Sequence, residues 1–135
     1  IIKEYPDIKL ITEQHVPAEQ PINDAEEITA NLLTANPDKD SVTAIFAAWD
    51  EPAIGAAKAL AEAGRDEVIV TGVDGNEQAV QMIKDGSCLK ATVKQNFEGM
   101  AEIVCQQMEK YYAGETIEKG EMYAPAELIT QENAQ

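Results

Sequence analysis

Three side chains at the ends of separate apolar segments combine an aromatic face, a carboxylate and an amide: Trp49, Asp74 and Gln95. A carboxylate accepts hydrogen bonds from two neighbouring hydroxyls, and an amide donates to one hydroxyl while it accepts from another. An indole ring covers the apolar C–H face of the same kind of molecule. Provided that the fold brings the three together, they predict a site for a small polyhydroxylated ligand, either a sugar or a sugar alcohol.

Ordinary structural roles are open to the same residues. Asp74 fits a solvated turn acid, Gln95 a surface amide and Trp49 an anchor at an interface. Beside them we expect helix N-caps, whose side-chain oxygens accept the free amides of a first helical turn. The expected N-caps are Asp50, Asn76 and Asn96.

The sequence lacks the motifs of nucleotide-binding and hydrolytic enzymes. It contains no G-x-G-x-x-G after the first expected strand, no G-x-x-x-x-G-K-[ST] and no G-x-S-x-G, so a phosphate cradle and a nucleophile elbow are both missing. A phosphoacceptor receiver domain has a similar length and topology, with Asp50 or Asp74 as its nominal acceptor. Such a domain needs paired acids to hold Mg²⁺ after its first strand, where this sequence has Glu13, Gln14 and His15. We therefore expect a protein that is not an enzyme and has no catalytic residue and no cofactor.

Histidine and cysteine give no metal site. His15 is the single imidazole of the sequence and is expected in a solvent-facing loop. Cys88 and Cys105 form neither a C-x-x-C pair nor a zinc cluster. Buried free thiols are expected at both positions because cysteine behaves as a small core hydrophobe, and a disulfide between the two is the alternative.

The composition is that of one modest globular domain with an acidic surface. The 135 residues are 44% hydrophobic and carry a formal net charge of −15, so a packed core is expected. A surface of this charge repels nucleic-acid backbones and anionic membranes, so no nucleic-acid partner is expected. No apolar run approaches the roughly 20 residues of a membrane span, and the first residues lack the zones of a signal peptide.

Short apolar runs alternate with segments of helical period along the chain. Strands are expected at 8–13, 42–48, 68–73, 88–94 and 122–130. Helices are expected at 22–35, 51–63, 76–85 and 97–113. This alternation predicts an α/β fold of the doubly wound type, with a mostly parallel sheet and helices on both faces. Ligands of such sheets bind beyond the carboxyl ends of the strands, where Trp49, Asp74 and Gln95 are expected.

Three consecutive stretches carry a resemblance to a known family. They read AIFAAWDEPAIGAAKALAEAG at 44–64, EVIVTGVDGNEQAVQMIKDG at 67–86 and LKATVKQNFEGM at 89–100. In this order they closely resemble the C-terminal lobe of ribose-type periplasmic sugar-binding proteins of ABC importers, which have the type I solute-binding fold. The resemblance implies a small sugar or sugar alcohol held between two hinged lobes. It also implies delivery to a membrane permease from the periplasm, or from the cell exterior with a lipid anchor in a Gram-positive organism.

The resemblance assigns site residues as well. It implies that Asp74 and Gln95 bind sugar hydroxyls. At the position of Trp49 the ribose-type pattern commonly has an asparagine, so this sequence loses an amide and gains an aromatic wall, and ribose itself is not the expected ligand. Gln20 is a weaker candidate contact, because it lies in a loop that contributes an aromatic residue near the pocket in this family.

The resemblance further divides the chain and exposes what is missing from it. Residues 1–96 correspond to part of the C-terminal sugar-binding lobe, residues 97–121 to a crossover helix that packs on the other lobe, and residues 122–135 to a return strand and tail. An N-terminal lobe and the first strand and helix of the C-terminal lobe have no counterpart here, and we expect them to be supplied by the rest of the protein.

The effector domain of LacI-type transcription regulators is the alternative interpretation. That family shares the F-A-A-x-D-E and G-x-D elements of the sequence but usually continues with a proline-bearing T-T-V segment. The segment ATVKQ at 91–95 favours the importer instead, and no helix-turn-helix segment is present.

Overall fold

The structure is a computed structural model that describes residues 4–134. Its helices are α1 (Pro21–Ala35), α2 (Asp50–Glu62), α3 (Glu77–Lys84) and α4 (Phe97–Tyr112), with a short 3₁₀ turn η2 (Lys39–Ser41). Its strands are β1 (Ala44–Phe46), β2 (Ile69–Asp74), β3 (Leu89–Lys94) and β4 (Glu127–Thr130). No helix within the described residues is long and apolar enough to cross a membrane.

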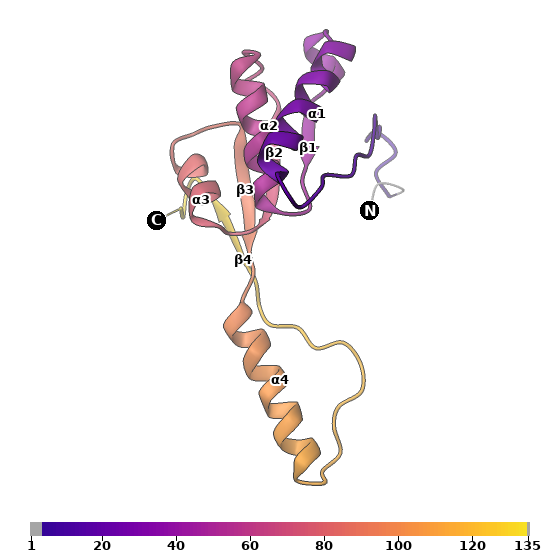
Figure 1. The fold of residues 1–135 in the computed structure, drawn as a ribbon, viewed down its shortest axis with the longest axis vertical. Helices are drawn as coiled ribbons and strands as arrows, with labels where there is room; N and C mark the ends of the chain where they lie inside the picture. The colour runs from indigo at the N-terminus through magenta and orange to yellow at the C-terminus, as the bar shows by residue number, and fades with distance from the viewer. Residues whose placement is uncertain (1–3, 135) are drawn as a thin grey trace.

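The four strands form one sheet in the order β1-β2-β3-β4 (Figure 1). β1, β2 and β3 run parallel, and Ile45 pairs with Val70 across the first two. β4 closes the sheet in the antiparallel direction, with Ile129 beside Thr92. Since a helix connects each parallel strand to the next, the expected α/β class with a mostly parallel sheet is confirmed.

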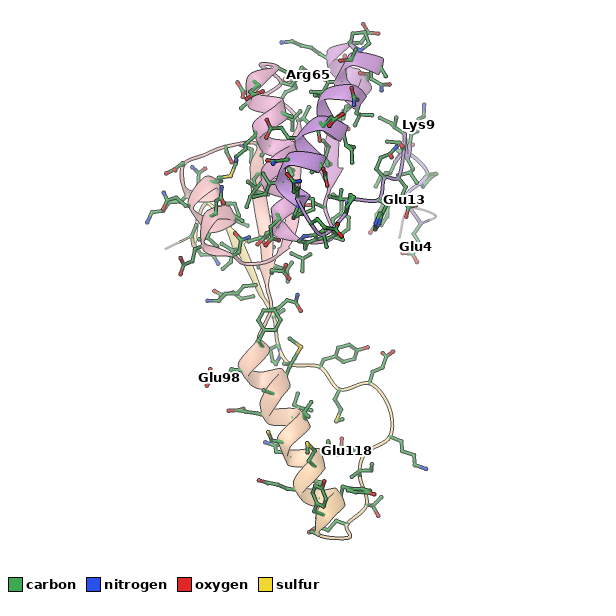
Figure 2. The ribbon with its side chains drawn as sticks, viewed as in Figure 1. Glu4, Lys9, Glu13, Arg65, Glu98 and Glu118 are labelled. Carbon is green, nitrogen blue, oxygen red and sulfur yellow. The ribbon has the colours of Figure 1, made fainter. Side chains whose placement is uncertain are left out.

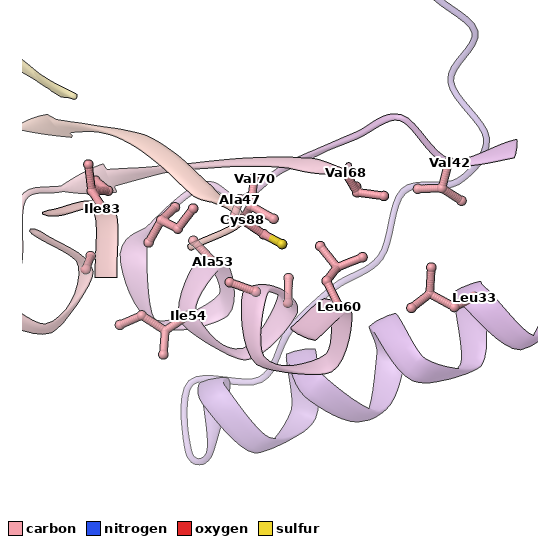
Figure 3. Packing of buried hydrophobic residues seen from close by; sticks show 14 of the residues in the cluster. Leu33, Val42, Ala47, Ala53, Ile54, Leu60, Val68, Val70, Ile83 and Cys88 are labelled. Carbon is pink, nitrogen blue, oxygen red and sulfur yellow. The ribbon is translucent and has the colours of Figure 1, made fainter. Parts of the chain in front are cut away.

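Helix α2 lies between the sheet and α1 and forms the centre of the core (Figure 3). Its Ile54 and Leu60 are completely buried, and most of its other residues are small. Gly55 lets α1 approach closely, because a Cβ at this position would lie 2.1 Å from the backbone oxygen of Ile22. The small residues of α2 therefore allow three layers to stack at close range.

One face of the sheet is covered by helices of this chain and the other is open. Val70, Leu89 and Ile129 belong to the covered face and pack in the core with α2 and α3. The alternate residues along the strands face the opposite side, where Phe46 is 73% exposed and Leu128 is 59% exposed. The sequence predicts helices on both faces, but within residues 4–134 no helix lies over this second face, because the helices that contact the sheet, α2 and α3, both pack on the covered face.

The buried guanidinium of Arg65 links the turns at the amino ends of β1 and β2 by hydrogen bonds. Arg65 donates hydrogen bonds to the backbone oxygens of Lys39 and Val42, at 2.7 and 3.4 Å, and to the carboxylate of Glu67 at 2.5 Å. Figure 2 places Arg65 at the end of the molecule opposite to α4. The carboxyl ends of the strands are thus at the end that faces α4.

Helix α4 stands apart from the sheet and its covering helices (Figure 1). Figure 2 labels Glu98 at the beginning of α4, and from there the helix extends away from the sheet. The apolar stripe of α4 is solvent-exposed, since Phe97 is 62%, Val104 57% and Met108 51% exposed. The segment that follows returns along the helix, and Lys110 Nζ lies 3.7 Å from the carboxylate of Glu118.

Two expected strands differ from the structure. Residues 8–13 form no strand, and Ile8 and Leu10 are more than half exposed. Apolar alternation alone is not enough here, because a strand also needs a neighbour that accepts its hydrogen bonds. The last strand begins only at Glu127, because Pro125 has no N–H group for the ladder.

Candidate functional site

The candidate site lies at the carboxyl edge of the sheet, where three parallel strands lead into helices. Trp49 precedes α2, Asp74 is the last residue of β2, and Gln95 follows β3. All three side chains are partly buried. The sheet therefore brings to one edge three positions that are widely separated in the sequence.

Asp74 and Gln95 are in direct contact. The Gln95 amide Nε2 donates a hydrogen bond to Asp74 Oδ1 at 2.5 Å, and the Gln95 backbone N–H donates to the Asp74 carbonyl at 3.3 Å. Within the described residues, Asp74 Oδ2 and Gln95 Oε1 make no hydrogen bond. The pair thus has acceptor atoms free for a ligand, and the amide is already oriented by the carboxylate.

The backbone of Asp74 is strained. Its φ is +124°, and it is the one residue other than glycine that has a positive φ in the part of the chain that the structure describes. A side chain in this region of φ costs on the order of 1–3 kcal/mol and persists only where the surroundings enforce it. Such strain is typical of residues whose position serves a ligand.

Asp50 is not a helix N-cap, contrary to expectation. Trp49 occupies the N-cap position of α2, and Asp50 is the first residue of the helix. The side chain of Asp50 is completely buried. Its Oδ1 accepts a hydrogen bond from Thr92 Oγ1 at 2.6 Å, and its Oδ2 accepts one from the Asn76 backbone N–H at 2.8 Å. The carboxyl group is drawn across the sheet because Gly72 leaves it room: a Cβ on Gly72 would lie 2.4 Å from Oδ1.

The other two expected N-caps are confirmed. Asn76 Oδ1 accepts a hydrogen bond from the Ala79 N–H at 2.8 Å, and Asn96 Oδ1 accepts one from the Gly99 N–H at 2.9 Å. These caps fix where α3 and α4 begin. As a result, α3 begins three residues after Asp74, and α4 begins two residues after Gln95.

Trp49 and Gln20 do not contact the Asp74–Gln95 pair through any hydrogen bond. Trp49 is linked to the pair only through its neighbour Asp50, whose Oδ2 accepts a hydrogen bond from the Asn76 N–H in the loop that follows Asp74. Gln20 is exposed at the start of α1, and its Oε1 accepts a hydrogen bond from Asn23 Nδ2 at 3.3 Å. The structure thus brings two of the four candidates into direct contact, and Gln20 makes no hydrogen bond to either of them.

Cysteine and histidine contribute nothing to this edge. Cys88 is buried, and desolvation raises the pKa of its thiol. The expectation of two buried thiols is wrong for Cys105, which is exposed on α4 because no other element of the described chain covers that helix, and both cysteines are free. His15 is exposed, as expected. Residues 4–134 contain no cluster of histidine, cysteine or acidic side chains that could hold a metal ion.

A hollow of this surface lies elsewhere. It measures about 690 Å³ and lies between α1 and α2, lined by Asn23, Leu33, Ala59 and Arg65 among others. None of the four candidate residues lines it, and its lining includes the acidic side chains of Glu26, Glu27 and Glu62. Because its lining includes none of the residues that the sequence predicts for the ligand, the carboxyl edge of the sheet remains the candidate site.

Comparison with known sequences places this arrangement in a family. Residues 1–116 match the model of the periplasmic binding protein domain. A ribose import binding protein of Salmonella typhimurium is 38% identical over 91 residues, which are 67% of this chain and 29% of that protein. A D-apiose import binding protein of Actinobacillus succinogenes is 32% identical over 135 residues, which cover 99% of this chain and 42% of that protein. The chain therefore spans less than half the length of these relatives.

A solved structure has the same architecture. An ABC transporter solute binding protein from Agrobacterium vitis with bound allitol superposes with a TM-score of 0.89 at 32% sequence identity. The match covers 98% of this chain and 46% of that one. The α/β fold predicted from the sequence is thus confirmed by a structure as well as by the element order.

Proposed function

Because this chain belongs to the periplasmic binding protein domain family, we propose that the protein containing it captures a small sugar or sugar alcohol for an ABC importer. One observation carries the proposal: Asp74, held at a strained φ of +124°, contacts Gln95 at the carboxyl edge of a parallel sheet. The names of the relatives support the ligand class, since they refer to ribose, apiose and allitol.

Each side chain at the edge has its own role in this proposal. Asp74 Oδ2 accepts hydrogen bonds from ligand hydroxyls, and Gln95 Oε1 accepts a further one while its Nε2 stays on Asp74. Trp49 covers the C–H face of the ligand. Gln20 is a weaker candidate, because it is exposed and makes no hydrogen bond to the pair.

A second lobe supplies the other wall of the site. Trp49, Asp74 and Gln95 are only partly buried, and a binding protein buries most of a small ligand between opposed surfaces. Residues 1–96 then form part of the sugar-binding lobe, residues 97–121 cross to the other lobe, and residues 122–135 return to the sheet. The exposed apolar stripe of α4, with Phe97 62% and Val104 57% exposed, supports this division because such a stripe requires a packing partner.

The proposed activity is binding without chemistry. Asp74, Gln95 and Trp49 form no nucleophile–base pair, and no bond is made or broken in the ligand. The two lobes close on the ligand by a hinge motion, and the closed form is recognised by a membrane permease. The protein works without a cofactor, in the periplasm or outside the cell, where a lipid anchor holds it if the organism is Gram-positive.

A thermal-shift screen of the intact protein tests the proposal. D-Ribose, D-apiose, D-allose and allitol are added separately, and at least one is expected to raise Tm in a concentration-dependent manner. The same ligand must lose its effect on the Asp74→Ala variant. A shift that is equal in both proteins would show that the sugar binds away from this edge.

A further inference from the structure

One buried carboxyl group is connected to all three loops of the candidate site. Asp50 follows Trp49 in the sequence, and its side chain is fully buried. Its Oδ2 accepts a hydrogen bond at 2.8 Å from the backbone N–H of Asn76, which lies two residues after Asp74. Its Oδ1 accepts a hydrogen bond at 2.6 Å from the hydroxyl of Thr92, which lies in the strand that leads to Gln95.

The hydroxyl of Thr92 extends this connection to the loop after β2. Thr92 is completely buried; it donates to Asp50 Oδ1 and accepts a hydrogen bond from the Gly75 N–H at 3.2 Å. The backbone N–H groups of Gly75 and Asn76, the two residues that follow Asp74, are therefore both held by this buried pair. The strained φ of Asp74 is the kind of conformation that persists only under such constraints.

We propose that Asp50 and Thr92 are positioning residues for ligand binding: they touch no ligand themselves, but fix the loop that presents Asp74 to it. This inference rests on the proposed function of Asp74. Asp50 sits directly over Gly72, at a distance that leaves no room for a side chain there, so the carboxyl group is an integral part of the sheet edge. Neither side chain is exposed to solvent, which distinguishes them from the partly buried Asp74, Gln95 and Trp49.

The test uses Thr92→Val in the intact protein. Valine keeps the shape of threonine but leaves Asp50 Oδ1 and the Gly75 N–H without their partner. Isothermal titration with whichever of D-ribose, D-apiose, D-allose and allitol gives the largest thermal shift is expected to show affinity about tenfold weaker, as for a lost hydrogen bond to a carboxylate. Asp50→Asn, which retains one acceptor oxygen, is the second variant and is expected to weaken binding in the same direction.

A double-mutant cycle separates positioning from general destabilisation. In the Asp74→Ala background, Thr92→Val is expected to change affinity by less than about twofold, since its effect passes through Asp74. A tenfold loss in both backgrounds would overturn the inference while leaving the proposed function intact. If Asp74→Ala alone leaves affinity unchanged, the proposed function fails, and the inference fails with it.

Hydrogen exchange of the ligand-free protein gives a readout that does not depend on the ligand. The amides of Gly75 and Asn76 are expected to exchange faster in Thr92→Val, whereas amides in α1 keep their rates. Thr29→Val is the matched control, because Thr29 is a buried threonine in α1, away from the edge. Unchanged exchange at Gly75 and Asn76 in Thr92→Val would contradict the positioning role.

Discussion

Replacement of Asp74 by alanine is expected to weaken sugar binding by about two orders of magnitude. Gln95 Nε2 occupies one hydrogen-bonding position on Oδ1, and the structure leaves Oδ2 without a partner among the described residues. The carboxylate therefore has room for two ligand hydroxyls. Two such charge-assisted hydrogen bonds, at about 1.5 kcal/mol each, amount to about 3 kcal/mol, or roughly 150-fold in Kd.

Calorimetric titration of the intact protein measures this loss. Asp74→Asn keeps the shape of the side chain but not its charge, so it is expected to fall between the native protein and Asp74→Ala. Asp85→Ala is the matched control: Asp85 is an exposed aspartate at the C-cap of α3, which leads to the opposite edge of the sheet, and its replacement is expected to leave Kd unchanged. An Asp74→Ala protein that binds as tightly as the native one would refute the assignment of this carboxylate to the ligand.

Four further predictions concern strain, thiol burial, pH and the second lobe. Asp74→Gly is expected to unfold with a free energy about 1 kcal/mol higher than Asp74→Ala in urea titrations, because only glycine tolerates φ near +124°; equal stabilities would deny the strain. The buried Cys88 thiol, whose pKa is raised by desolvation, is expected to react with a thiol reagent no faster than the protein unfolds, and immediate labelling of the folded protein would contradict its burial. The hydrogen bond from Arg65 lowers the pKa of Glu67 below its usual 4.5. The stability that this pair contributes is therefore fully present above pH 4.5 and is lost as the pH falls through the lower pKa of the folded protein. In Glu67→Gln the free energy of unfolding is expected to lose this dependence on acid pH, and an unchanged dependence would contradict the role of the pair. Val104→Asp on the exposed stripe of α4 is expected to lower Tm of the intact protein, whereas an unchanged Tm would mean that no lobe packs there.

The repeating elements of the fold follow from local patterns in the sequence. The sequence predicts a helix at 51–63, and α2 runs from Asp50 to Glu62, because its apolar period and Gly64 mark its extent without tertiary information. Asn76 and Asn96 likewise cap the helices that begin beside them. These features are predictable because the interactions that decide them lie within a few residues of one another.

The role of Asp50 was not predictable in this way. An aspartate at the start of a helix suits an N-cap, and nothing nearby in the sequence indicates another partner. Its real partners are Thr92 and the loop after Asp74, which the sheet brings within reach, and Gly72 provides the space. The signal that was available is the coincidence of a glycine and a threonine on adjacent strands, facing the same residue.

The expected strand at 8–13 and the burial of Cys105 fail for a related reason. Both expectations assume a neighbour: a strand edge beside Ile8 and Leu10, and a packed surface against α4. Within residues 4–134 neither neighbour is present, so Ile8 and Cys105 are both exposed. Apolar character in a sequence indicates that a surface is to be covered, but it does not say by which part of the protein.

The position of a bound sugar in the intact protein tests the central claim most directly. A crystal structure with allitol, or with the sugar that gives the largest thermal shift, is expected to place ligand hydroxyls within about 3.2 Å of Asp74 Oδ2 and Gln95 Oε1. The ring of Trp49 is expected against the C–H face of the ligand. A ligand found elsewhere, with Asp74 and Gln95 bonded only to each other and to water, would contradict the claim that this edge of the sheet holds the sugar.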